Sequence, residues 1–125
     1  MKPVWVGEAI VIAMHEHLLA AHGGASGVRD SALLESALAR PQQLMAYGDP
    51  DFYDLAAGYA AGIVHNHPFV DGNKRTGFMA AYLFLARNGI QLVASEVDAV
   101  QIVTALAANE VEESKFADWL RNNCE

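Results

Sequence analysis

The feature that most constrains the fold is a row of helix-length apolar segments separated by helix breakers. Apolar residues recur at helical spacing, the first segment ends at Gly23-Gly24, and the second starts after the capping residue Asp30 and meets Pro41. Strand signals are poor, because only residues 90–94 alternate. We therefore predict an all-α fold of about six helices. The predicted helices span residues 6–22, 31–40, 51–65, 76–88, 96–108 and a last piece that starts at Ser114.

Two of these segments allow finer predictions. The third carries Gly58 and Gly62 four residues apart, at a cost to helix propensity that close helix packing would offset, so we expect it to be the central, buried helix. In the first, the histidines are expected at the surface: His15, His17 and His22. The apolar positions of that helix that set its period are Ile10, Ala13, Met14, Leu18 and Ala21.

Residues 42–51 are predicted to be a connecting segment. They contain Tyr47, Gly48, Asp49 and Pro50, a set typical of turns, so a surface loop or flap is expected. The sequence alone does not decide whether this segment lies near the polar motif described below or away from it.

Length and charge bound the class of protein. A chain of 125 residues suits a single domain, residues 1–125. No apolar run reaches the length of a membrane span and no signal peptide opens the chain, so a cytoplasmic protein without membrane contact is expected. The net charge of −7 argues against direct nucleic-acid binding, which needs a basic surface. The single cysteine, Cys124, is predicted to be an unreactive terminal thiol.

Polar side chains are concentrated between His67 and Gly77, which read His-Pro-Phe-Val-Asp-Gly-Asn-Lys-Arg-Thr-Gly. The motif is followed directly by an apolar helix. A glycine-containing polar loop that enters a helix presents unpaired backbone N–H groups and the positive end of the helix dipole to an anion. We therefore predict a phosphate-binding site at this motif.

Within the motif, His67 is the candidate general base, because an imidazole titrates near neutral pH. The alternative is that His67 only caps a helix or fills a polar gap. Asp71 lies beside two cations that favour its charged form, and such a carboxylate can hold Mg²⁺. An Asp at this place can equally be a helix N-cap.

The remaining motif residues are predicted to bind the anion. Gly72 gives the backbone room to turn its N–H groups, and the amide of Asn73 either binds a phosphate oxygen or fixes the loop. Lys74 supplies a compact mobile charge, whereas Arg75 supplies a planar fork that can bind two oxygens. The alternative for these two is a solvated basic pair.

Two other classes of functional site were compared with the amino-acid sequence of the motif. The motif is not a P-loop, because Gly72-Asn73-Lys74 lacks the required Gly-Lys-Ser/Thr order and no strand precedes it. A metal-dependent hydrolase site made by His65, His67 and Asp71 is a possible but unspecific ligand set.

At these residues the sequence resembles the Fic/Doc family, and within it the Doc (death-on-curing) branch of toxins from toxin–antitoxin pairs. The family pattern is His-x-Phe-x-Asp/Glu-Gly-Asn, then Gly or Lys, then Arg, and residues 67–75 satisfy it. The resemblance extends over nearly the whole chain. It includes Gly23-Gly24, Arg29-Asp30, the run 34–38 and Asn88-Gly89.

The resemblance implies a compact Fic-like bundle and a role for each motif residue. By analogy His67 would deprotonate a target hydroxyl, Asp71 would hold Mg²⁺, the amides from Gly72 to Lys74 would form an anion hole and Arg75 would clamp phosphate. Lys74 stands where AMP-transferring members have a second Gly, and its side chain would crowd the subsite of the α-phosphate. Phe69 would anchor the loop in the core.

The Doc branch implies a function as well. Its members are understood to transfer the γ-phosphate of ATP to elongation factor Tu, which stops translation, and to be neutralised by a Phd-like antitoxin whose C-terminal segment folds as a helix into a groove. The chain lacks the family's complete inhibitory helix motif, because the nearest match ends at Ser36. Residues 42–51 would be the target-docking flap.

Two alternatives stay open at the level of sequence. Gly72 matches the Fic pattern where the Doc prototype has Ala, so protein adenylylation by the same motif is the second candidate. The third is a non-catalytic module that binds an antitoxin and regulates its own operon.

Overall fold

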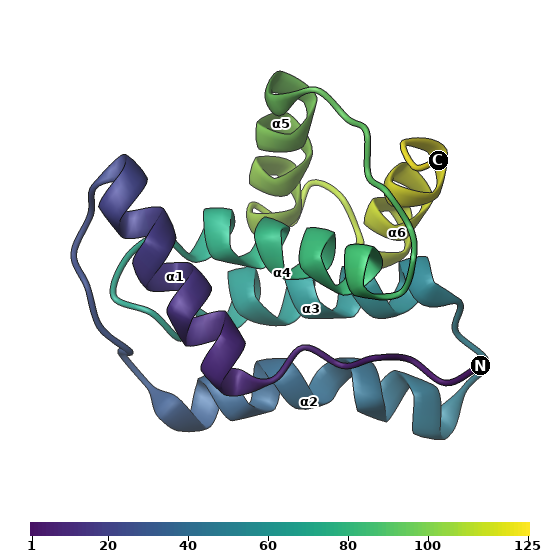
Figure 1. Ribbon diagram of the computed structural model, residues 1–125, viewed down its shortest axis with the longest axis horizontal. Coiled ribbons are helices and arrows are strands. Elements are labelled where there is room, and N and C mark those ends of the chain that lie inside the picture. The colour runs from purple at the N-terminus through teal and green to yellow at the C-terminus, as the bar shows by residue number, and fades with distance from the viewer.

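The computed structural model describes residues 1–125 and contains six α-helices and no strands, which confirms the predicted all-α fold (Figure 1). Two isolated bridges, Val28 with Phe69 and Leu92 with Cys124, are the only β-type pairings, and the second falls in the segment 90–94. The helices are α1 (Glu8–His22), α2 (Ser31–Tyr47), α3 (Phe52–Asn66), α4 (Asn73–Arg87), α5 (Glu96–Ala107) and α6 (Glu113–Asn122).

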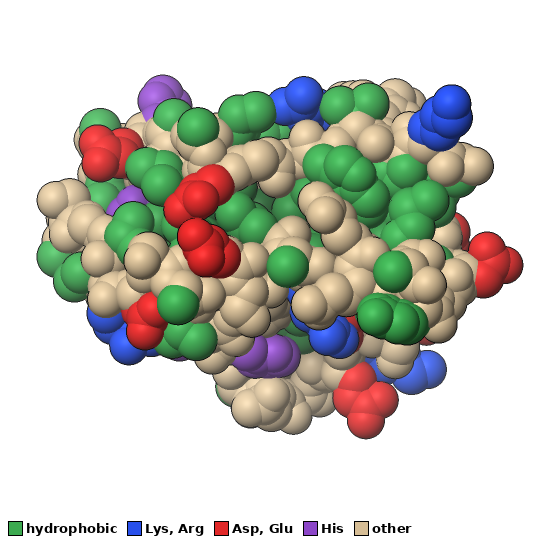
Figure 2. Space-filling view, turned by 90° about the horizontal axis from the view of Figure 1, so that it is seen from below, with side chains coloured by type: hydrophobic (Ala, Val, Ile, Leu, Met, Phe, Trp, Pro, Cys, Tyr) green, Lys and Arg blue, Asp and Glu red, His purple; other side chains and the backbone are tan.

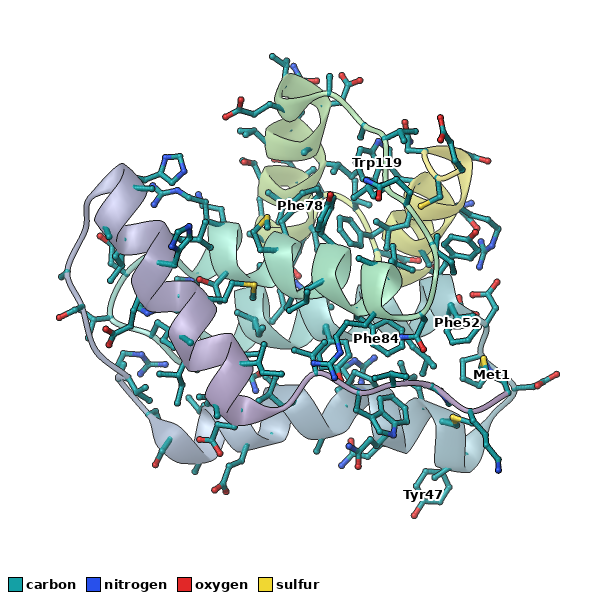
Figure 3. The ribbon with its side chains drawn as sticks, viewed as in Figure 1. Met1, Tyr47, Phe52, Phe78, Phe84 and Trp119 are labelled. Atoms are coloured by element: carbon teal, nitrogen blue, oxygen red, sulfur yellow. The ribbon has the colours of Figure 1, made fainter.

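Helix α3 is the central helix, as predicted. Every residue from Leu55 to Val64 is buried, and the helix packs against α2, α4, α5 and α6, while α1 crosses the end of the bundle beside α4 (Figure 1). A cluster of 23 buried residues forms one core. The labelled side chain of Phe84 points from α4 into this core, where it contacts Tyr59 and Trp5 (Figure 3).

The prediction that Pro41 ends the second helix is wrong. Helix α2 continues to Tyr47 with Pro41 buried inside it. Proline has no N–H to bond the carbonyl four residues earlier, which is that of Ala37. Helix α3 packs directly on this carbonyl: a Cβ added to Gly62 would lie only 2.9 Å from the Ala37 oxygen. The two α3 glycines therefore allow the close packing expected of them, and the burial of Pro41 offsets the lost hydrogen bond.

Residues 42–51 are consequently not a long loop. Only residues 48–51 connect α2 to α3, and they lie at the end of α3 opposite to the motif, because α3 runs from Phe52 to Asn66 before the motif begins (Figure 1). The side chain of Tyr47 is 91% exposed and points away from the body at that far end (Figure 3). The prediction of a surface loop or flap over residues 42–51 is wrong for residues 42–47, which are helical, and the placement that the sequence left open is away from the motif.

Helix α1 buries a different face from the one predicted. Its buried residues are Val11, His15 and Leu19, whereas Ile10 is exposed. The expectation that His15 lies at the surface is wrong, since its exposed fraction is 2%. The spacing of four between these three residues places them on one side of the helix.

Helix α4 starts at Asn73, three residues before the predicted start, so Lys74 and Arg75 lie in its first turn. Helix α6 starts at Glu113, one residue early. At the other end of α4, Asn88 bonds both the N–H and the carbonyl of Val4, at 2.8 and 3.1 Å, and Tyr59 Oη accepts the N–H of Val6 at 2.9 Å. These bonds fix the N-terminal segment over the core.

Figure 2 shows one face of the surface, where acidic and basic side chains are interspersed and no basic area extends across it. None of the six helices combines the length and the apolar character that crossing a bilayer requires.

Burial raises the pKa of the Cys124 thiol, which lowers its thiolate fraction, in agreement with an unreactive cysteine.

Candidate active site

A cavity of about 810 Å³ opens at the motif end of the bundle. The motif residues line one side and α5 lines the other, and the apolar side chains of α4 lie between them. Phe78, labelled in Figure 3, is one of those α4 residues and lies below α5. The lining residues include His67, Asp71, Gly72, Asn73, Lys74 and Arg75. The structure therefore brings all six predicted site residues to one cavity.

The loop from Pro68 to Gly72 is anchored on its buried side by a stack of two rings, those of Phe69 and His15. Phe69 is fully buried, as the resemblance implied, and the ring of His15 lies face to face on it at a centroid distance of 3.9 Å. His15 Nε2 donates a hydrogen bond of 2.8 Å to the carbonyl oxygen of Asp71. Helix α1 thus fixes the backbone of the loop immediately before the start of α4.

His67 occupies the C-cap of α3 in a left-handed conformation, with φ 51° and ψ 53°. Its backbone N–H bonds the Ile63 carbonyl at 3.1 Å, while its side chain is exposed at the cavity. The backbone of His67 therefore ends a helix, as one of the two sequence interpretations expects, and its imidazole faces the cavity, where its role as a general base stays a prediction.

Asn73 fixes the loop with its side chain. Phe69 N–H donates to Asn73 Oδ1 at 3.0 Å, which identifies the other amide atom as Nδ2. Nδ2 donates to the Phe69 carbonyl at 3.0 Å and to His67 Nδ1 at 3.2 Å. The amide is buried and all its groups are used, so of the two predicted roles of Asn73 the structure supports the loop-fixing one.

The first turn of α4 presents free donors to the cavity. Gly72 is the N-cap, with φ 77°, and no side chain caps the helix. The backbone N–H groups of Asn73, Lys74 and Arg75 accordingly have no partner in the chain. The side chains of Lys74 and Arg75 are exposed at the same cavity and form no ion pair. Amides, helix dipole and two cations together favour a bound polyanion.

Asp71 is not the N-cap of α4, since Gly72 takes that position. Its Oδ1 accepts the Gly72 N–H at 2.8 Å and its Oδ2 accepts the Ala25 N–H at 3.3 Å, which leaves acceptor capacity on an exposed carboxylate. A single carboxylate suits Mg²⁺, because this ion keeps several waters and takes further ligands from substrate phosphates. The residues present therefore fit Mg²⁺ bound together with a phosphate substrate.

The metal-hydrolase interpretation is contradicted by the geometry. His65 Nε2 bonds the Leu106 carbonyl at 2.9 Å, and no three His, Cys, Asp or Glu side chains gather at a common point. The three residues were grouped by their spacing in sequence, but His65 lies on a helix face that packs towards α5.

Three site residues were missed or left without a role by the sequence analysis. His15 supports the Asp71 carbonyl, Arg29 bonds the end of α3, and Gly24 leaves room for the carboxylate of Asp71, since an added Cβ would lie 2.8 Å from its Oδ2. The segment 23–30, and not 42–51, is the one that runs beside the motif. A signal for His15 was present, because it lies midway between Val11 and Leu19 on one helix face.

Comparison with known proteins identifies relatives of this chain. The model of the Fic/DOC family matches residues 5–85. The chain is 34% identical over 112 residues to "Protein kinase doc" of Escherichia phage P1, covering 89% of this chain and 88% of the phage protein. It is also 47% identical over 76 residues to "Toxin Doc" of Mycolicibacterium smegmatis, covering 59% of this chain and 58% of that protein. A protein with this site and these matches belongs to the Fic/DOC family.

Proposed function

We propose that this protein is a Doc-type toxin that transfers the γ-phosphate of ATP, with Mg²⁺, to a hydroxyl group of a translation factor in the bacterial cytoplasm. Elongation factor Tu is the proposed target. The observation that carries the proposal is the set of unpaired amides and cations in the first turn of α4, at the cavity that also holds His67 and Asp71. The name of the phage relative, a protein kinase, supports it.

In the proposed reaction the target oxygen attacks the γ-phosphorus, the bond between that phosphorus and the β–γ bridging oxygen breaks, ADP leaves, and His67 accepts the hydroxyl proton. Lys74, Arg75 and the free amides of residues 73–75 would stabilise the phosphate charge as it redistributes. Asp71 would hold Mg²⁺, which supplies further charge neutralisation when bound.

The hydrogen bond from Asn73 has a consequence for His67. A neutral imidazole that accepts at Nδ1 carries its hydrogen on Nε2, so Nε2 is not yet a base. Base function at Nε2 therefore requires Asn73 to release Nδ1. This contact is the longest of the three that the Asn73 amide makes, and the amide keeps both bonds to Phe69 after release.

The decisive experiment incubates the purified protein and elongation factor Tu with ATP labelled in the γ or in the α position. Label from the γ position on the factor supports the kinase, whereas label from the α position alone establishes adenylylation, the second candidate. Gly72 is the feature that favours this second candidate, because it preserves the Fic pattern at the helix start. Failure of either label to appear, together with no growth arrest on expression, favours the non-catalytic module.

We also propose a Phd-like antitoxin as partner, with its C-terminal helix against the cavity. Val97 and Val100 on α5 are 66% and 57% exposed, and Val100 lines the cavity, so an apolar helix face has a surface to pack on. Titration of a synthetic peptide of the antitoxin's C-terminal segment tests this. Val100→Asp should weaken binding, while Val4→Asp, at an exposed valine of the N-terminal segment, should not.

A further inference from the structure

The end of α3 is a strained point on which the direction of the His67 side chain depends. His67 is one of only two non-glycine residues with positive φ in the chain. For such a residue the left-handed conformation is unfavourable and persists only where neighbouring groups fix it. The last carbonyls of any helix also lack partners within the helix. The last carbonyls at this turn therefore need a partner group from outside α3.

That group is the guanidinium of Arg29. Its Nε donates to the His67 carbonyl at 2.7 Å and its Nη2 donates to the Asn66 carbonyl at 3.0 Å. Arg29 forms no ion pair with any acidic residue, so its polar contacts are with the backbone of α3. The planar fork reaches two consecutive carbonyls, and its charge lies at the negative end of the helix dipole.

The backbone of Arg29 is attached to the same loop. Its N–H bonds the Pro68 carbonyl at 2.7 Å, and on the other side of the isolated bridge Val70 N–H bonds the Gly27 carbonyl at 3.1 Å. Asn66 Nδ2 adds a bond of 3.0 Å to the Leu33 carbonyl at the start of α2. The motif loop thus positions the backbone of Arg29, and the side chain of Arg29 in turn fixes the start of that loop at His67.

We infer that Arg29 is the positioning residue for His67, because its guanidinium fixes the left-handed turn that directs the imidazole into the cavity. The inference rests on the proposed function for its consequence in the reaction. Arg29 itself acts through the His67 backbone and is assigned no contact with substrate. Loss of the guanidinium should lower turnover and leave nucleotide binding at the α4 start nearly intact, since none of its bonds reach residues 73–75.

The kinetic test compares Arg29→Met, which keeps the aliphatic stem, with Arg29→Lys, whose single ammonium can bond one carbonyl. A misplaced catalytic group costs up to about 100-fold in rate, so Arg29→Met should lower kcat about 10- to 100-fold and change KM for ATP by less than about threefold. Arg29→Lys should recover part of kcat. Arg87→Met, at the last turn of α4, is the matched control and should be unchanged.

A second readout needs no activity. In ¹⁵N-histidine spectra the wild-type His67 should show Nδ1 as an acceptor and a hydrogen on Nε2, and Arg29→Met should change this pattern while His65 keeps its own. If the wild type transfers no label, the proposed function fails and the spectra alone judge this inference. Unchanged His67 signals in Arg29→Met, or kcat within about twofold of wild type, would overturn it.

Discussion

The two ends of the α3 helix solve the same problem, unpaired helix groups, in opposite ways. At its N-terminus Asp51 and Asp54 form a reciprocal capping box, and Arg121 of α6 bonds both carboxylates, with Nη2 2.8 Å from Asp51 Oδ2. At its C-terminus Arg29 bonds the last two carbonyls, but in the adjoining first turn of α4 the two cations have no acidic partner and three backbone amides have no partner at all. The first end is satisfied internally and the second retains capacity for a ligand.

The difference shows that the groups that stabilise the fold and the groups available for a ligand lie at opposite ends of α3. All the ion pairs lie on α2, α3 and α6 or between them, and none involves a motif residue. Substitutions at the α6 end should therefore change the free energy of unfolding and leave activity alone. Substitutions at the motif end should do the reverse.

The largest effect is expected for His67→Ala. Loss of a general base costs about 10²- to 10⁴-fold in rate, and because the side chain is exposed the melting temperature should hardly change. Labelled phosphate transfer and thermal unfolding measure the two quantities. His17→Ala, at an exposed histidine of α1, is the control. Full activity of His67→Ala would remove the proposed base.

The next effect is expected for Gly24→Ala. An added Cβ would lie 2.8 Å from Asp71 Oδ2, so the carboxylate must move, and a displaced ligand-holding group costs about 10- to 100-fold in metal affinity or activity. The measurement is activity as a function of Mg²⁺ concentration. Gly23→Ala has positive φ as well but meets no atom within 4 Å, so it separates contact from backbone strain. Equal losses in both variants would count against the contact.

Gly62→Ala should lower stability without touching the chemistry. Its Cβ would lie 2.9 Å from the Ala37 carbonyl, and overpacking of this kind costs about 1–3 kcal/mol. Urea unfolding gives the free energy, and activity per folded molecule should stay at the wild-type value. Gly7→Ala, where an added Cβ meets open space, lacks the overpacking and should lose less stability, only the preference for Gly over Ala at the N-cap of α1. A Gly62→Ala protein of unchanged stability would show that α2 and α3 can separate freely.

The smallest effect is expected for Arg121→Met, about 0.5–1 kcal/mol, because the ion pairs are partly exposed. It should also alter the pH dependence of stability. Partial burial would raise the pKa of Asp51, but hydrogen bonds from the Asp54 amide and from Arg121 outweigh burial and lower it below 3.8. The resulting stabilisation is present above that value and is lost as the pH falls through the lowered folded-state pKa.

Unfolding of both proteins from neutral pH downwards into the acid range is the measurement, since the stabilisation is lost as the pH falls through the lowered pKa of the carboxyl. The wild type should lose more stability than Arg121→Met as the acid end is approached. Parallel curves would mean that Arg121 has no influence on Asp51. Activity at neutral pH should be the same in both proteins.

How much could be predicted depends on the distance along the chain between the residues concerned. The motif residues were identified correctly as neighbours because residues 67–75 are contiguous, and a loop that enters a helix places them together. His15 and Arg29 were not assigned roles, because their partners lie 56 and 38 residues away. A local sequence pattern gives no information on contacts between residues so far apart in the chain.

The errors in the helices have the same origin. Pro41 predicts a helix end by its local chemistry, but α3 packs on the freed carbonyl and the helix continues. His15 predicts a polar surface position by its residue type, but a carbonyl and an aromatic ring satisfy it in the interior. In both cases a contact from another helix outweighs the local preference.

The sequence by itself determined the all-α class, the six helices and the run of polar residues that enters α4, since periodicity, caps and contiguity are local properties of a chain. Only the tertiary structure decided which segment runs beside the motif, which face of α1 is buried and what holds His67 in its left-handed turn. Those outcomes depend on the packing of helices that are far apart in sequence. Packing is a property of surfaces brought together, and no single segment encodes it.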